Sequence, residues 1–442
     1  MGLSQWLLRI QRSGKTKNSL FLLAEKLLLL SLGFLLTLLL ARMWPAQRLG
    51  EYQYLLAMVA LLGPFSALGL NSLVSRELVL SQEDTGKVLG TALLLRIAGA
   101  LFAGMLMFVA SFWWVEATLR PIFWLLLCSQ VFHAFGVFDF YFESKVRSWV
   151  SATLRSANGA FFLTVKLMWL WGNGSLEGML LITAIEWLLL GVLWHRVFRL
   201  AEPNRYSLSV SWQQAIYLLR RCGWLLLSGV AAVIYLKVDT VMLGWLDDKS
   251  EVARYSLASR LSEVWYIFPG ILVASWFPSL LTLKGQNHEH YRKRLQSLCD
   301  FLAWIAIIIA LLITMVSAPL MAWLFGEQYR DAGNILQIHI WASVFIFMRA
   351  LLSKWILIED IPKYSLLTHG AGALLNIGLN AMWIPHFGGE GAAMATLISY
   401  AAASYFSLFL FHKTRPFALV MTKSLLLPVR LLFLRSTRLG ND

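Results

Sequence analysis

Long apolar runs alternate with short polar connections along the whole chain. Each run has roughly 18 to 25 residues, the length that an α-helix needs to cross the hydrocarbon core of a bilayer. Six runs lie in the first half and six in the second, at residues 18–41, 52–71, 88–111, 118–142, 152–171, 177–195, 215–236, 254–282, 300–325, 333–357, 363–384 and 390–411. The pattern predicts an all-α polytopic membrane protein with about 12 transmembrane helices.

The first apolar run follows a basic leader, as the apolar segment of a secretory signal peptide does. However, the stretch from Leu20 to Leu40 is close to full spanning length, and no Ala-x-Ala cleavage site follows it. We therefore expect this run to be retained as the first transmembrane span.

Composition supports a membrane protein and gives no sign of a disulfide framework. Of 442 residues, 58% are hydrophobic and 14% are charged, which is too little polar surface to cover several soluble domains. The three cysteines, Cys128, Cys222 and Cys299, lie far apart and form no Cys-x-x-Cys pair. Neither a disulfide framework nor a zinc site is therefore predicted.

The placement of the basic residues predicts the topology. The chain has 38 Lys and Arg residues and a formal net charge of +14. About 26 of them fall in the N-terminus, the even-numbered connections and the C-terminal tail, against about 6 in the odd-numbered connections. Because basic connections stay in the cytoplasm, we expect both termini to be cytoplasmic and expect no nucleic-acid partner.

The chain divides into two halves of six spans each. The longest polar connection, residues 198–213, lies between them, so the sequence predicts an N-terminal lobe at residues 1–205 and a C-terminal lobe at 206–412. A basic tail at residues 413–442 is expected to lie along the cytoplasmic interface, where it would favour anionic membrane lipid. Similar strings follow the first span of each half, "GEYQYLLAMVALLGPF" from Gly50 and "ARYSLASRLSEVWYIFPG" from Ala253.

Longer strings carry a resemblance to a known family. The stretch "LARMWPAQRLGEYQYLLAMVALLGPFSALGLNSLVSREL", Leu40 to Leu78, resembles the opening signature of polysaccharide flippases. The strings "KVDTVMLGWL" from Lys237 and "GEGAAMATLISY" from Gly389 look like landmarks of the second lobe in the same family. The chain thus resembles Wzx-type flippases of lipid-linked oligosaccharides, such as O-antigen units, in the multidrug/oligosaccharidyl-lipid/polysaccharide exporter superfamily. That fold has two six-helix lobes around a central cavity.

The resemblance implies a function, with alternatives. A Wzx-type flippase would move an undecaprenyl-pyrophosphate-linked oligosaccharide from the cytoplasmic to the periplasmic leaflet of the bacterial inner membrane by alternating access. A polysaccharide polymerase and a chain-length regulator would be its candidate partners. Lipid II flippases carry two further spans after the twelfth, which makes a peptidoglycan role less expected. An ion-coupled multidrug exporter of the same superfamily and a non-transporting scaffold are the alternatives.

The sequence offers no catalytic chemistry. Gly14-Lys15-Thr16 lacks the second glycine of a phosphate-binding loop, because Arg9 stands at that position. Neither a His-Glu-x-x-His nor a Gly-x-Ser-x-Gly pattern occurs. We therefore expect no enzymatic activity, metal or cofactor.

Basic residues inside the predicted spans are candidates for substrate binding. A charge at the bilayer centre costs at least about 2.5–3.5 kcal/mol, so it usually faces a partner or a water-filled cavity. Lys26, Arg96 and Arg349 would each lie roughly 12–14 Å inside the cytoplasmic face, at about 1.5 Å per residue. With Arg260 they could bind a pyrophosphate through charge-assisted hydrogen bonds. Alternatively, each cation pairs with a carboxylate.

Acidic residues inside the spans are candidates for ion coupling. Glu186 lies near the middle of its span and could accept a proton, while Glu25 and Glu263 are further candidates. Arg260 and Glu263, at i and i+3, could instead neutralise each other. Lys166 and Asp239 lie near outer span ends, where we expect Lys166 to extend its charged end to the interface. Asp139 is expected to cap the nearby Lys145 or Arg147.

Overall fold

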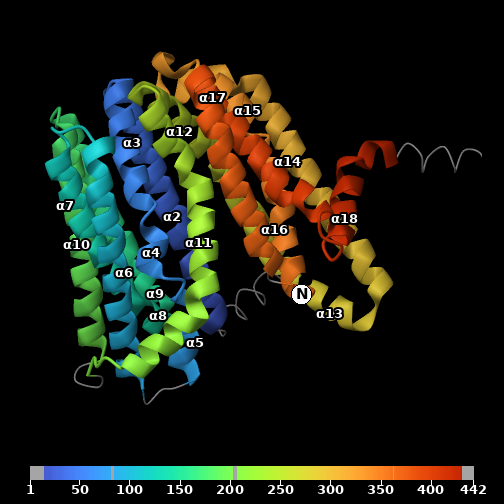
Figure 1. The fold of residues 1–442 in the computed structure, drawn as a ribbon, viewed down its shortest axis with the longest axis horizontal. Helices are drawn as coiled ribbons and strands as arrows, with labels where there is room; N and C mark the ends of the chain where they lie inside the picture. Colours follow the sequence, from blue (N-terminus) through green and yellow to red (C-terminus); the bar gives the residue numbers. More distant parts are fainter. Residues whose placement is uncertain (1–13, 81–83, 203–206, 362, 431–442) are drawn as a thin grey trace, which may run out of the picture. The chain divides into compact units, whose positions relative to one another are not determined.

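The computed structural model describes residues 14–80, 84–202, 207–361 and 363–430, and the regular structure within these ranges is helical (Figure 1). The chain separates into two compact units. One comprises Met1–Pro45 and Leu55–Val233, and the other comprises Ala46–Tyr54 and Ile234–Asp442. The all-α class predicted from the apolar runs is confirmed.

The first unit is a bundle built around the long helices of the N-terminal half. Its core joins α5, α6, α8 and α10 through side chains such as Leu89, Phe138 and Phe198. The helices of this half are α2 (Gly14–Met43), α3 (Ala46–Ala60, whose first nine residues belong to the second unit), α4 (Gly63–Ala67), α5 (Asn71–Leu80), α6 (Thr85–Trp114), α7 (Arg120–Gln130), a 3₁₀ segment (Val131–Gly136), α8 (Val137–Ser144), α9 (Ser148–Trp171) and α10 (Leu176–Ala201).

The second unit is a bundle around α14 and α16. Leu302, Phe347 and Leu351 are fully or almost fully buried in its core. Its elements are the end of α11 (Trp212–Leu246), α12 (Lys249–Glu263), a 3₁₀ segment (Val264–Tyr266), α13 (Ile267–Gln286), α14 (His288–Phe325), short 3₁₀ segments (Glu327–Tyr329 and Phe406–Phe409), α15 (Ala332–His339), α16 (Ala342–Ile358), α17 (Lys363–Ser404) and α18 (Arg415–Leu425).

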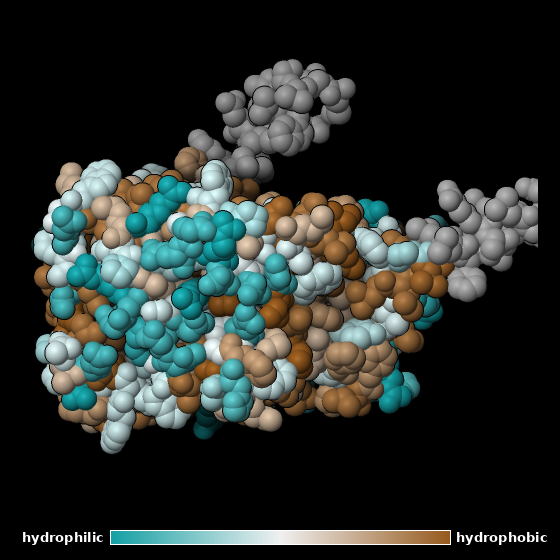
Figure 2. Space-filling model, turned by 90° about the horizontal axis from the view of Figure 1, so that it is seen from above, coloured by the Kyte–Doolittle hydropathy of each residue, from teal (hydrophilic) through white to brown (hydrophobic). Residues whose placement is uncertain are grey.

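Most predicted spans coincide with helices that could cross a membrane. Among the described residues, eight helical stretches are long and apolar enough, and they cover nine of the predicted runs. The three remaining runs, at 52–71, 152–171 and 215–236, are also helical, as α3 with α4, α9 and α11. Figure 2 shows one face of the molecule from above, with hydrophilic side chains gathered mainly over its left and centre and hydrophobic ones toward its edges.

The label α17 covers two predicted spans, which are two helices that meet at a sharp kink at Gly388. Gly388 has φ 52° and ψ −130°, a left-handed conformation that an L side chain adopts only with strain. The carboxylate of Glu251 accepts a hydrogen bond from the amide N–H of Gly389, at 3.2 Å. The non-helical backbone at Gly388 therefore separates two helices, as the sequence predicts for the last two spans.

The predicted lobe boundary at residues 205/206 lies outside the described residues. The division of the structure falls within α11 instead, between Val233 and Ile234. The beginning of α11 packs into the core of the first unit through Leu218 and Cys222, and Tyr217 donates a 3.0 Å hydrogen bond to Glu77. The seventh span thus begins as part of the first unit.

The beginning of α3 belongs to the second unit, an exception to the predicted lobes. A methyl group on Gly50 would overlap the carbonyl oxygen of Lys249, so the two backbones touch. The Lys249 ammonium lies 3.9 Å from the centre of the Tyr54 ring and donates to the carbonyl of Gly244. Residues 46–54 are therefore held against the end of α11 and the start of α12.

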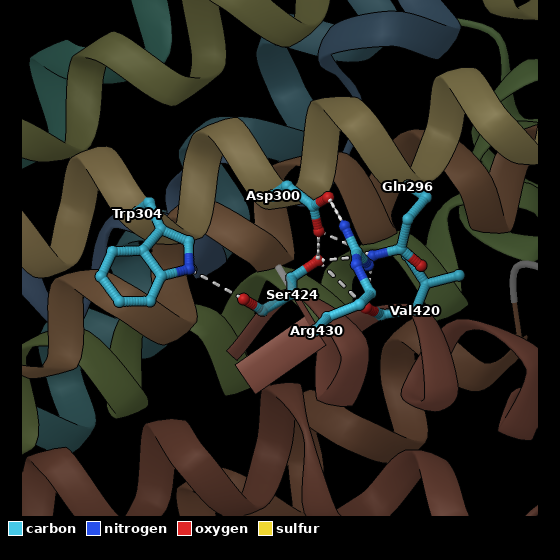
Figure 3. Close-up of polar contacts among 6 residues, drawn as sticks. All are labelled: Gln296, Asp300, Trp304, Val420, Ser424 and Arg430. Carbon is cyan, nitrogen blue, oxygen red and sulfur yellow. Dashed lines mark hydrogen bonds and ion pairs between the residues drawn. The ribbon is translucent and has the colours of Figure 1, made fainter. Parts of the chain in front are cut away.

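The first part of the predicted tail packs into the second unit as α18 (Figure 3). Asp300 of α14 accepts hydrogen bonds from Ser424 (2.7 Å) and Gln296 (2.8 Å) and forms an ion pair with Arg430. The indole N–H of Trp304 donates to the Ser424 carbonyl at 2.9 Å. This part of the tail is anchored by polar contacts as well as by its apolar face, and residues 431–442 lie outside the described ranges.

Candidate functional site

The most unusual charged group of the second unit is the carboxylate of Asp239 on α11. Only 2% of this residue is exposed. It accepts hydrogen bonds from the Tyr255 hydroxyl of α12 (2.8 Å) and the Thr396 hydroxyl of α17 (2.6 Å). The side-chain amide of Asn380, earlier in α17, donates a third (2.5 Å). Three helices thus converge on one buried acid.

Every donor to Asp239 is neutral. Within the described residues, no Lys, Arg or His forms an ion pair with it, although other acids of the chain have such partners. Removing a carboxylate from water costs several kcal/mol, which neutral hydrogen bonds offset only in part. Asp239 is therefore suited to hold a proton or a small cation.

Two asparagines on α17 extend the oxygen-rich surroundings of this acid. Asn380 also donates to the amide oxygen of Asn376 at 3.1 Å, while Asn380 Oδ1 has no hydrogen-bond partner among the described residues. If the side-chain amide of Asn380 rotated by about 180°, its oxygen would face the oxygens of Asp239 and Asn376. Together with the hydroxyl oxygen of Thr396, these oxygens would suit a hard cation.

A small cavity lies next to the carboxylate. Its volume is about 10 Å³, close to the space of one water molecule. Its lining includes Lys237, Glu263 and His339, together with Asp239, Tyr255 and Thr396. The Lys237 ammonium lies 3.8 Å from the carboxylate of Glu263, one of the predicted coupling residues. The sequence did not indicate Lys237 as its partner.

Glu25, a second predicted coupling residue, is part of a three-residue ion cluster in the first unit. Arg155 of α9 bonds both oxygens of Glu25, at 2.5 and 2.9 Å, and also bonds Asp139 at 2.5 Å. The prediction that Asp139 caps Lys145 or Arg147 is therefore wrong, because a closer cation lies on the neighbouring helix. The cluster joins α2, α8 and α9.

Glu186, a third predicted coupling residue, is paired across two helices. Lys166 of α9 donates to its carboxylate at 2.6 Å. Lys166 is only 6% exposed, so the prediction that its charged end reaches the interface is wrong. The ammonium stays inside because Glu186 neutralises it there.

The predicted substrate-binding cations fall in both units. Lys26 is exposed on α2, whereas Arg96 in α6 is 7% exposed and donates to the His133 carbonyl at 3.1 Å. Arg349 in α16 is also 7% exposed and donates to the Ala403 carbonyl (2.9 Å) and the Thr368 hydroxyl (3.0 Å). Arg260 is half-buried on α12, one turn before Glu263. Arg96 and Arg349 thus each donate hydrogen bonds to residues of their own unit.

Sequence reasoning underrated Asp239, which was expected near an outer end of its span. A usable signal was present, since Asn376 and Asn380 lie four residues apart and so share one face of an apolar helix. Buried amides on one face of a membrane helix need polar partners.

Comparisons with known proteins show the family. The family described as "Polysaccharide biosynthesis protein" matches residues 16–284, well over half of the chain, and the MatE family matches residues 225–382. This chain belongs to the polysaccharide biosynthesis protein family. The predicted membership of the multidrug/oligosaccharidyl-lipid/polysaccharide exporter superfamily is confirmed.

Two curated relatives come from Haloferax volcanii. "Probable flippase AglR" is 25% identical over 209 residues, 45% of this chain and 44% of the relative. "Probable low-salt glycan biosynthesis flippase Agl15" is 22% identical over 192 residues, 43% of this chain and 41% of the relative. The matches thus span less than half the length of these relatives.

Solved structures show the same fold at low identity. The lipid II flippase MurJ in an inward closed conformation has a TM-score of 0.70 at 14% identity, covering 94% of this chain and 92% of MurJ. An inward-facing multidrug resistance MATE transporter has a TM-score of 0.69 at 13% identity, covering 90% of this chain and 96% of that one. The chain is therefore a multi-pass membrane protein with the fold of this superfamily.

Proposed function

We propose that this protein is a flippase for an undecaprenyl-pyrophosphate-linked oligosaccharide, moving it from the cytoplasmic to the periplasmic leaflet for O-antigen or another surface polysaccharide. The observation that carries the proposal is the family match over residues 16–284. The description of both curated relatives as probable flippases, one of them for glycan biosynthesis, supports it. The membrane would be the bacterial inner membrane with both termini cytoplasmic, and a polymerase and a chain-length regulator would be partners.

Transport is proposed to be coupled to a monovalent cation, a proton or sodium, at Asp239. The support is the burial of this carboxylate and its ring of neutral donors from α12 and α17. A cation that binds there removes the cost of the buried charge, and its release restores that cost. Binding on one side of the membrane and release on the other would therefore bias a conformational equilibrium.

The pyrophosphate of the substrate is proposed to bind the cations Lys26, Arg96, Arg260 and Arg349. A phosphate that leaves water needs charge-assisted hydrogen bonds, which arginine forks supply. Support comes from their position within the helical region and from the two buried nitrogens of Arg96, Nε and Nη1, that lack a hydrogen-bond partner among the described residues.

Reconstitution into liposomes tests the substrate. Fluorescent undecaprenyl-pyrophosphate-linked oligosaccharide is placed in both leaflets, and the fraction accessible to an external quencher is followed over time. We expect the protein to speed the exchange of this lipid. Protein-free liposomes are the control, and a rate equal to theirs would contradict the proposal.

A multidrug exporter is the alternative that the MatE match over residues 225–382 raises. The likeness to MATE structures lies below 25% identity and concerns the fold alone. Adding a cationic dye to the same liposomes separates the two functions, because an exporter would accumulate or expel the dye and leave the lipid-linked glycan unmoved.

A further inference from the structure

Three charged side chains line the cavity beside Asp239. Lys237 and Asp239 lie on α11, and Glu263 lies at the end of α12. The side chains of Lys237 and Glu263 are 41% and 32% exposed, whereas Asp239 is 2% exposed. The ion pair thus lies on the accessible side of the cavity and the lone acid on its buried side.

The remaining lining of the cavity is uncharged. From α15, the imidazole of His339 meets the Tyr255 ring edge to face, at 5.8 Å between centres. From α17, Thr396 and Tyr400 contribute hydroxyl groups. Arg260 carries charge near Glu263 but is not part of the lining. With a neutral imidazole, two carboxylates and one ammonium give the lining one net negative charge.

We propose that the Lys237–Glu263 pair sets the charge of the Asp239 cavity, so that the cavity accepts one monovalent cation and rejects a divalent one. This inference rests on the proposed coupling role of Asp239. A proton or sodium ion brings the lining to neutrality. A divalent cation would leave one uncompensated positive charge at a buried position, which costs several kcal/mol. The volume of about 10 Å³ admits one small ion.

The charges predict how each variant changes cation binding. Glu263→Gln makes the lining neutral, so we expect monovalent binding to weaken by about tenfold, because the cation then enters a cavity without a net negative charge. Lys237→Gln gives two net negative charges, which strengthens monovalent binding and admits calcium. The double variant regains one net negative charge and should return to near wild-type affinity.

The experiment uses the full chain in lipid nanodiscs and follows its thermal unfolding. Sodium chloride is titrated against choline chloride at constant ionic strength, and calcium chloride is titrated separately, because a ligand of the folded state raises Tm with its concentration. If sodium does not raise the Tm of the wild type, the proton is tested next as the cation. The pH at which the difference in stability between the wild type and Asp239→Asn is half of its maximum then measures the affinity of the site for a proton.

Rescue by the double variant is the decisive result. A double variant that binds no better than Glu263→Gln would overturn the inference, as would a Lys237→Gln variant without a calcium response. Lys237→Arg keeps the charge and should behave as the wild type, which controls for local structural damage. If Asp239→Asn leaves the cation response unchanged, the proposed coupling site itself is wrong, and this outcome differs from failure of the charge rule.

Discussion

Thr396 donates a 2.6 Å hydrogen bond to the carboxylate of Asp239, a residue 157 positions earlier in the chain. Thr396 follows the bend of α17 at Gly388, whereas Asn380, another donor to the same carboxylate, precedes it. The bend thus brings both parts of α17 to one acid on α11. We therefore expect a change in the charge of that acid to affect both parts at once.

Removing the Thr396 hydroxyl should weaken this arrangement. Thr396→Val deletes a hydrogen bond to a buried charged group, which contributes about 1.5–3 kcal/mol. We expect a lower Tm and a weaker dependence of Tm on the coupling cation. Thr314→Val is the matched control, because its buried hydroxyl has no hydrogen-bond partner among the described residues. Equal losses in both variants would contradict a special role for Thr396.

The apolar pattern predicted the helices well because spanning length is a local property of the sequence. The hydrogen-bond and ion-pair partners of buried charges are not local. Arg155 lies 130 residues from Glu25 and Asn380 lies 141 residues from Asp239, so no spacing rule joins them. Lys166 was misjudged for the same reason, since its depth was apparent while its partner on α10 was not.

The division of the chain was only partly predictable. The polar connection at residues 198–213 indicated two halves, but packing decides which half each helix end joins. The close approach of Gly50 to Lys249 places the start of α3 in the second unit, and an isolated glycine in a sequence gives little sign of such a contact.

Gly50 therefore offers a test of the fold. In Gly50→Ala, the added methyl group would overlap a backbone carbonyl, so we expect a loss of about 1–3 kcal/mol from the free energy of unfolding. Gly104→Ala, in a helix interior with open space around the new methyl group, should be neutral or stabilising. Thermal unfolding of the two variants in nanodiscs measures the difference. A Gly50→Ala protein as stable as the Gly104→Ala protein would contradict the described contact.

Glu186 can be tested apart from its partner. Glu186→Gln removes the carboxylate that neutralises the buried Lys166, so we expect a loss of about 3–5 kcal/mol in stability. The double variant Lys166→Met with Glu186→Gln should recover most of it and retain ion-driven transport. Should the stable double variant lose its response to the ion gradient, Glu186 would share in the coupling.

The topology predicts the location of six reporter fusions. Fusions after Asn204, Gln286 and the C-terminus should report cytoplasm, and fusions after Gly174, Asp248 and Gly388 should report periplasm, as the distribution of Lys and Arg requires. Alkaline phosphatase and a fluorescent protein serve as the paired reporters. One reversed reporter would refute the twelve-span arrangement.

The proposed ion coupling predicts that gradient-driven translocation depends on Asp239. Liposomes containing the wild type or Asp239→Asn receive labelled undecaprenyl-pyrophosphate-linked oligosaccharide and an imposed proton or sodium gradient, and the initial flipping rate is compared with and without the gradient. We expect the gradient to speed flipping by the wild type and to have no effect on Asp239→Asn, while circular dichroism shows the same helix content in both. An equal response of both proteins to the gradient would contradict ion coupling at Asp239.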